Sequence, residues 1–129
     1  MSMTFMQMAE EAMAEVEGIS VEETKQRIDA DPNALIIDVQ DNADVTVAGL
    51  ASGGQNISLG NLPIKADLDL PAEWTDPGLQ DRSRQIIVTC ELGLNGARGA
   101  KLLKDMGFTN VSYMEGGMEA WRAAGLPID

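Results

Sequence analysis

Cys90 is the residue best suited to chemistry, and it is the only cysteine in the sequence. It follows the strand-like run Ile86–Thr89, precedes a loop that contains Gly93 and Gly96, and is followed by a helical pattern from about Ala97 to Met106. In this layout the amide N–H groups of the loop and of the first helical turn converge on the sulfur. Such donors favour a thiolate, so the pattern predicts a nucleophile. The alternative is an inert cysteine buried at a strand end.

Other catalytic chemistries are excluded by composition. The chain has no histidine, which removes cysteine–histidine dyads, serine–histidine–aspartate triads and every histidine-ligated metal site. The acidic stretch Asp67–Leu70 lacks the alternating carboxylates of a calcium loop. We therefore expect no metal and no cofactor.

The net charge of −12, from 21 acidic and 9 basic residues, restricts the partners. It argues against nucleic acid and against an anionic membrane, and it repels small anionic substrates. The chain shows no apolar run of membrane-spanning length and no signal-peptide pattern. A single cysteine gives no reason to expect an oxidising compartment. The expected location is the cytoplasm.

The first 18 residues are predicted to form an amphipathic helical extension ended by Gly18. Its apolar positions recur at helical spacing, with glutamates outside the stripe; they are Phe5, Met8, Ala9, Ala12, Met13 and Val16. The stripe either packs on the rest of the chain or binds a partner, for example a second copy in a homodimer. Residues 19–129 are predicted to form one domain.

This domain is predicted to be α/β, with a central, mainly parallel sheet and helices on both faces. Its strands are Leu35–Val39, Ile86–Thr89 and Val111–Tyr113, each flanked by helical patterns. Residues 40–84 are weakly patterned, and only Asn56–Leu59 is a candidate strand there. Asp38 lies at the carboxyl end of its strand, where it either forms a turn or supports a site.

Several segments give the chain a resemblance to the rhodanese domain family of single-domain sulfurtransferases. Leu35–Val39 resembles the family's first-strand signature, Gly49–Ser58 its glycine-containing segment, and Ile86–Cys90 the strand that delivers its catalytic cysteine. The closing section is the most specific match, and it is carried by Lys101–Gly107, Phe108, Asn110, Val111, Glu115–Gly117, Trp121 and Gly125–Pro127.

The resemblance implies a mechanism in which Cys90 takes a sulfane sulfur from a donor and becomes a persulfide. The donor would be a small sulfane-sulfur compound or a persulfide-bearing protein, and the acceptor a thiol or a cyanide-like nucleophile. The terminal sulfur would be held mainly by backbone amides, those of Glu91, Leu92, Gly93, Leu94, Asn95 and Gly96. This chemistry needs neither metal nor histidine.

The sequence also departs from the family pattern. Asn95 stands where the family usually has an arginine, and Glu91 places a negative charge directly after the cysteine. Both changes disfavour an anionic donor. A related phosphatase would carry its arginine at Gly96, so phosphate-ester chemistry lacks its main cation. Two functions therefore remain, a sulfurtransferase or a rhodanese-like binding module of low activity.

Overall fold

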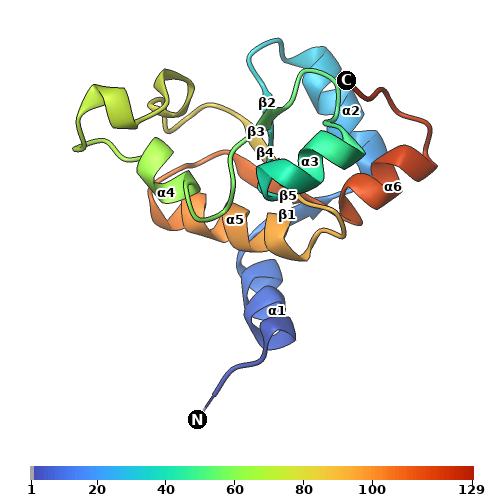
Figure 1. The fold of residues 1–129 in the computed structure, drawn as a ribbon, viewed down its shortest axis with the longest axis horizontal. Coiled ribbons are helices and arrows are strands. Elements are labelled where there is room, and N and C mark those ends of the chain that lie inside the picture. Colours follow the sequence, from blue (N-terminus) through green and yellow to red (C-terminus); the bar gives the residue numbers. More distant parts are fainter. Residues whose placement is uncertain (1) are drawn as a thin grey trace.

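A computed structural model describes residues 2–129 as six α-helices around one five-stranded sheet (Figure 1). Met1, which the predicted N-terminal helix included, lies outside the described residues. The strands are β1 (Glu17–Ile19), β2 (Leu35–Asp38), β3 (Gln55–Asn56), β4 (Ile86–Thr89) and β5 (Val111–Met114). The helices are α1 (Phe5–Glu15), α2 (Val21–Ala30), α3 (Asn42–Ala48), α4 (Leu62–Lys65), α5 (Leu94–Asp105) and α6 (Gly117–Ala123).

All paired strands run parallel, in the order β1-β5-β4-β2-β3. Side chains alternate across this sheet, so adjacent residues of β4 enter two different cores. Ile86 and Val88 belong to the core on the side of α5, while Ile87 belongs to the core that contains Trp121 of α6. Both faces are covered, which explains why the strands are continuous apolar runs. The predicted α/β class, the parallel sheet and the helices on both faces are confirmed.

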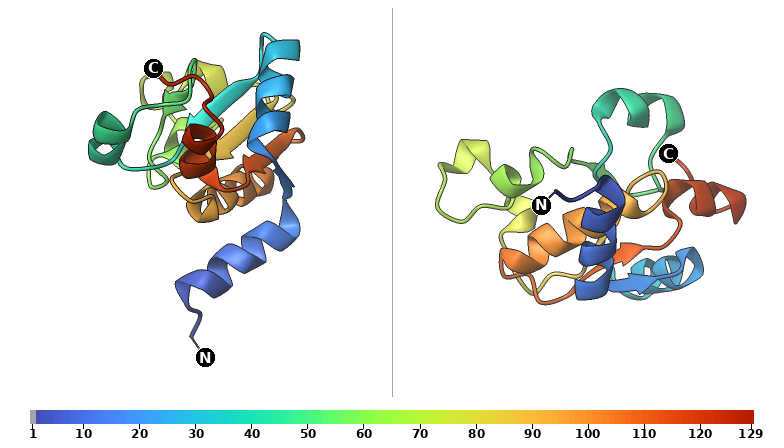
Figure 2. Two further views of the ribbon diagram at one scale, coloured as in Figure 1. Left: turned by 90° about the vertical axis from the view of Figure 1, so that its right-hand side faces the viewer. Right: turned by 90° about the horizontal axis from the view of Figure 1, so that it is seen from below.

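The N-terminal helix α1 packs on its own chain. It begins at a capping box, in which Thr4 and Gln7 bond each other's backbone N–H. Ala9 and Ala12 are buried, and α1 packs against α5 (Figure 2). Its small residues allow this close approach, while the rest of α1 extends beyond the domain. Met6 and other apolar side chains near the start of α1 stay about half exposed.

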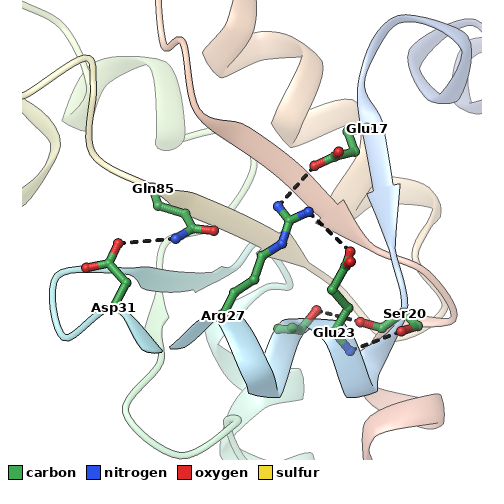
Figure 3. Close-up of polar contacts among 7 residues, drawn as sticks. Glu17, Ser20, Glu23, Arg27, Asp31 and Gln85 are labelled. Atoms are coloured by element: carbon green, nitrogen blue, oxygen red, sulfur yellow. Dashed lines mark hydrogen bonds and ion pairs between the residues drawn. The ribbon is translucent and has the colours of Figure 1, made fainter. Parts of the chain in front are cut away.

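Strand β1 connects α1 directly to the sheet, where it pairs with β5. The predicted boundary between residues 18 and 19 therefore falls inside a strand. Arg27 of α2 forms ion pairs with Glu17 of β1 and with Glu23 one helical turn earlier (Figure 3). Whether residues 19–129 fold without the extension stays a prediction.

Three further elements differ from expectation. Helix α5 starts at Leu94, three residues earlier than predicted, because Gly93 in the left-handed region serves as its N-cap. Helix α3 forms in the weakly patterned segment, and β3 spans only Gln55–Asn56. Within residues 2–129, no helix combines the length and apolar character needed to cross a membrane.

Candidate active site

Cys90 lies directly after β4, at the carboxyl edge of the parallel sheet, and only 5% of it is exposed. Its Sγ accepts hydrogen bonds from the backbone N–H groups of Gly93 and Gly96, each at 3.1 Å. The Gly96 amide belongs to the first turn of α5, so the sulfur takes the place of an N-capping side chain. Of the six predicted amides, these two contact the sulfur.

The two glycines are needed for different reasons. Gly93 has a φ of 98°, a left-handed conformation that side-chain-bearing residues resist. Gly96 lets α5 approach the end of β4, since a Cβ there would lie 3.1 Å from the Val88 carbonyl oxygen. The loop can therefore curl tightly enough to aim amides at one sulfur atom.

Further amides at this loop remain available. The backbone N–H groups of Leu94 and Asn95, in the first turn of α5, donate to no acceptor within residues 2–129. A helix start with unused donors favours a negatively charged ligand atom. Leu94 and Asn95 line the same cavity as Cys90.

Helix α6 holds the loop from the opposite side. The carbonyl oxygens of Cys90 and Glu91 accept hydrogen bonds from the N–H groups of Met118 at 2.8 Å and Glu119 at 2.9 Å. Gly117 permits this contact, because a Cβ there would come within 2.5 Å of the Cys90 oxygen. The Glu115–Gly117 turn thus fixes the backbone that carries Cys90.

The side chain of Glu91 forms an ion pair and hydrogen bond with Arg122 of α6. This arrangement compensates the negative charge that the sequence places beside the cysteine. The other carboxylate oxygen of Glu91, Oε1, is buried and has no hydrogen-bond partner within residues 2–129. Sequence reasoning missed Arg122, because nothing in the pattern links a late helix to the cysteine loop.

Asp38 shapes the neighbouring turn. It is 1% exposed and accepts hydrogen bonds from the backbone N–H of Gln40 at 3.0 Å and from the Gln40 side chain at 3.2 Å. Burial raises the pKa of the Asp38 carboxyl, and the Gln40 hydrogen bonds oppose that shift. In the sheet register Asp38 pairs with Thr89, the residue before Cys90. Its geometry is that of a turn-forming aspartate beside the cysteine strand.

A cavity of about 320 Å³ opens in front of Cys90. Its lining is part apolar and part acidic, and consists of Phe5, Val39, Gln40, Asp41, Asp44, Leu59, Cys90, Glu91, Leu92, Leu94 and Asn95. Phe5, Asp41 and Asp44 were not among the predicted site residues. The folding of α1 against α5 brings Phe5 to this wall.

Asn95 and the nearby cations are already engaged. The Asn95 side-chain oxygen accepts a hydrogen bond from Arg98 Nη1 at 2.9 Å, and the Arg98 guanidinium carbon lies 5.8 Å from the centre of the Phe5 ring. Lys101 pairs with Glu15 and Asp105. Within the described chain, no lysine or arginine lines the cavity in front of Cys90.

The chain thus has a doubly covered parallel sheet and, at the end of β4, a cysteine whose sulfur accepts two amide hydrogen bonds. The model of the rhodanese-like domain matches residues 20–124. The chain therefore belongs to the rhodanese-like family.

Individual relatives agree with this assignment. The chain is 27% identical over 113 residues to the Bacillus subtilis protein YtwF, provisionally named a sulfurtransferase, with 88% of this chain and 97% of that one covered. It is 31% identical over 100 residues to the thiosulfate sulfurtransferase GlpE of Actinobacillus succinogenes, with 75% and 77% covered.

One solved structure matches over nearly its whole length. It is a protein of unknown function from Rhodopseudomonas palustris, described as a possible tyrosine phosphatase. The TM-score is 0.90 at 27% sequence identity, covering 100% of this chain and 96% of that one.

Proposed function

We propose that this protein is a sulfurtransferase that carries a sulfane sulfur as a persulfide on Cys90. The observation that carries the proposal is the set of amides around the sulfur. Gly93 and Gly96 already bond Sγ, and the N–H groups of Leu94 and Asn95 are unused. These unused donors can hold the second, terminal sulfur of a persulfide anion, because the backbone supplies them whatever the side chains.

The reaction consists of two displacements at sulfur. The Cys90 thiolate attacks the outer sulfur of a donor, the bond from that sulfur to the donor breaks, and its electron pair leaves with the donor group. An acceptor thiolate or cyanide then attacks the terminal sulfur of the persulfide. The sulfur–sulfur bond to Cys90 breaks, its electron pair stays on Sγ, and the thiolate is restored.

The charge of the cavity favours an uncharged or protein-bound donor over thiosulfate. Asp41 and Asp44 line it, and Asn95 occupies the position at which the family resemblance expects an arginine. A dianion that enters meets carboxylates and no lining cation. The same reasoning disfavours a phosphatase, because phosphate-ester transfer depends on a cation at the phosphoryl oxygens.

A binding module of low activity is the second candidate. The low exposure of Cys90 favours it, since a donor must reach a nearly buried sulfur. Turnover decides between the two: the protein is supplied with cyanide and with the persulfide of 2-aminoethanethiol, whose ammonium and persulfide charges cancel, and thiocyanate is measured. The proposal expects catalytic turnover that Cys90→Ser abolishes. Equal rates for the two proteins would favour the binding module.

Two further proposals concern the location and the oligomeric state of the protein. We propose the cytoplasm as its location, because a lone nucleophilic cysteine has to stay reduced. We also propose a homodimer through the apolar side chains at the start of α1 and just before it, where Met3, Met6 and Met8 are partly exposed. Sedimentation should show a dimer that Met6→Glu dissociates.

A further inference from the structure

We infer that the cavity in front of Cys90 selects sulfur acceptors that carry a positive charge close to their thiol. This inference rests on the proposed sulfur transfer and names the class of acceptor for it. Such acceptors are aminothiols and cysteine residues flanked by basic side chains. The shared feature is a cation a few bonds away from the attacking sulfur.

The acidic wall of the cavity comes from the start of α3. Asp41 is the N-cap residue of that helix, yet its side chain makes no capping hydrogen bond. Within residues 2–129, neither Asp41 nor Asp44 takes part in an ion pair or accepts a side-chain hydrogen bond. Both residues are exposed and line the space in front of the sulfur. Their negative charges are therefore free to meet an entering ligand.

The cations around the cavity compensate these carboxylates only weakly. Arg122 pairs with Glu91. Arg98 lies outside the lining, bonded to Asn95 and close to the ring of Phe5. Lys65 lines an adjoining cavity together with Asp41, but the two do not form an ion pair. The field at the cavity mouth is therefore negative, in keeping with the charge of −12 for the whole chain.

The remaining lining suits a short aliphatic spacer. Phe5, Val39 and Leu59 give the cavity an apolar side in addition to its acidic residues. An acceptor with two or three methylene groups between its thiolate and its ammonium can place them on this apolar side. Its sulfur then attacks the terminal sulfur on Cys90, while its cation lies near Asp41 and Asp44. The bonds formed and broken are those of the second displacement described above.

The first arm of the test measures the transfer itself. Persulfidated protein is mixed with 2-aminoethanethiol, 2-mercaptoethanol or 3-mercaptopropionate, and rate constants are compared per thiolate. The aminothiol should react about three- to tenfold faster than the neutral thiol, and the anionic thiol slowest, the size expected for exposed charges a few ångströms apart. The ratio should shrink as salt is added. Two peptides are tested as well, one with a cysteine between lysines and one with a cysteine between glutamates. A faster transfer to the lysine peptide would show that the preference extends from free aminothiols to protein-borne cysteines.

The second arm needs no persulfide and so separates this inference from the proposed function. Cys90 is modified with aminoethyl, hydroxyethyl or sulfonatoethyl methanethiosulfonate, which differ in charge. The cationic aminoethyl reagent should react fastest and the anionic sulfonatoethyl reagent slowest. In the double variant Asp41→Asn/Asp44→Asn the three rates should converge, because the two free carboxylates are removed.

The matched control is Asp69→Asn/Glu73→Gln, which changes the net charge equally at exposed positions outside the cavity. It should keep the preference for the cationic reagent. If no persulfide forms but the methanethiosulfonate reagents still react in the expected order of charge, the proposed function is wrong while the selection of positively charged ligands by the cavity still holds. The inference is wrong if Asp41→Asn/Asp44→Asn leaves the ratios of the modification rates unchanged. It is also wrong if the control variant loses the preference for the cationic reagent to the same extent.

Discussion

Arg122 of α6 forms an ion pair with Glu91, the residue directly after the cysteine, although they are 31 positions apart in the sequence. The same helix donates backbone hydrogen bonds to the Cys90 and Glu91 carbonyl oxygens. Arg122 thus offsets the one carboxylate that is attached to the cysteine loop. It also ties that loop to α6.

Replacing Arg122 with glutamine should slow the alkylation of Cys90 by a neutral reagent such as iodoacetamide, by about three- to tenfold. Without Arg122, the carboxylate of Glu91 is uncompensated and opposes the thiolate. Arg27→Gln is the matched control, because Arg27, like Arg122, forms ion pairs with glutamate, here Glu17 and Glu23, but lies on α2 beside β1 (Figure 3). Equal alkylation rates in wild type and Arg122→Gln would show that the pair has no influence on the nucleophile.

Introducing a cation into the loop should raise turnover with thiosulfate. We expect Asn95→Arg combined with Glu91→Ala to increase kcat/KM for thiosulfate about tenfold or more, mainly through KM, because a charge-assisted hydrogen bond replaces a repulsion. The gain should fall as salt increases. Asn110→Arg combined with Glu73→Ala, at exposed positions beyond the loop, controls for the same change of +2 in net charge. Unchanged thiosulfate turnover, with Cys90 still alkylated readily, would show that donor charge is not limiting.

Removal of residues 1–15 should leave a cooperative thermal transition at a lower Tm. The truncated chain keeps β1 and most of both cores, and it loses Ala12 from the core on the side of α5 together with the buried contacts of Ala9. It also loses Phe5 from the cavity wall, so Cys90 should be alkylated faster. Differential scanning calorimetry is the measurement. A truncated chain without a cooperative transition would make α1 an integral part of the core.

Asp38 should make stability depend on pH in a definite direction. Because burial raises its pKa in the folded state above the ordinary 3.8, the folded chain binds a proton more readily than the unfolded chain. Its contribution to stability therefore becomes less favourable as pH rises from about 3.8 through the raised folded pKa. Asp38→Asn removes this cost, and its amide oxygen can still accept from Gln40 N–H.

Urea denaturation of both proteins between pH 4 and pH 7 measures this effect. The stability of Asp38→Asn relative to wild type should increase with pH, by about 1.4 kcal/mol for each unit by which the wild-type pKa is raised. A difference that stays constant, or that shrinks as pH rises, would contradict the assignment. Asp69→Asn, which removes an exposed carboxylate, should show no such trend.

The sequence predicted those parts of the fold that have strong local patterns. Apolar runs such as Ile86–Val88 and the helical spacing of α5 define the sheet and its cover, and the lone cysteine before Gly93 and Gly96 marks the site. Strand β1 was missed because it has three residues, one of them glycine, and gains its hydrogen bonds only from β5.

Several side chains around Cys90 could not be predicted either, because only the tertiary structure brings them there. Phe5 reaches the cavity through the packing of α1 on α5, and Arg122 reaches Glu91 through the position of α6. Asp41 and Asp44 lie in a segment without clear periodicity. Such contacts depend on tertiary structure, which local patterns do not encode.

The mass of the intact protein after incubation with a sulfane-sulfur donor tests the central claim most directly. The persulfide of 2-aminoethanethiol, a donor without net charge, should add one sulfur atom to the wild-type chain, the addition should map to Cys90, and cyanide should remove it. Cys90→Ser should gain nothing under the same conditions. A wild-type chain that alkylates readily at Cys90 yet never gains a sulfur atom would contradict the proposed persulfide and leave a rhodanese-like domain with another role.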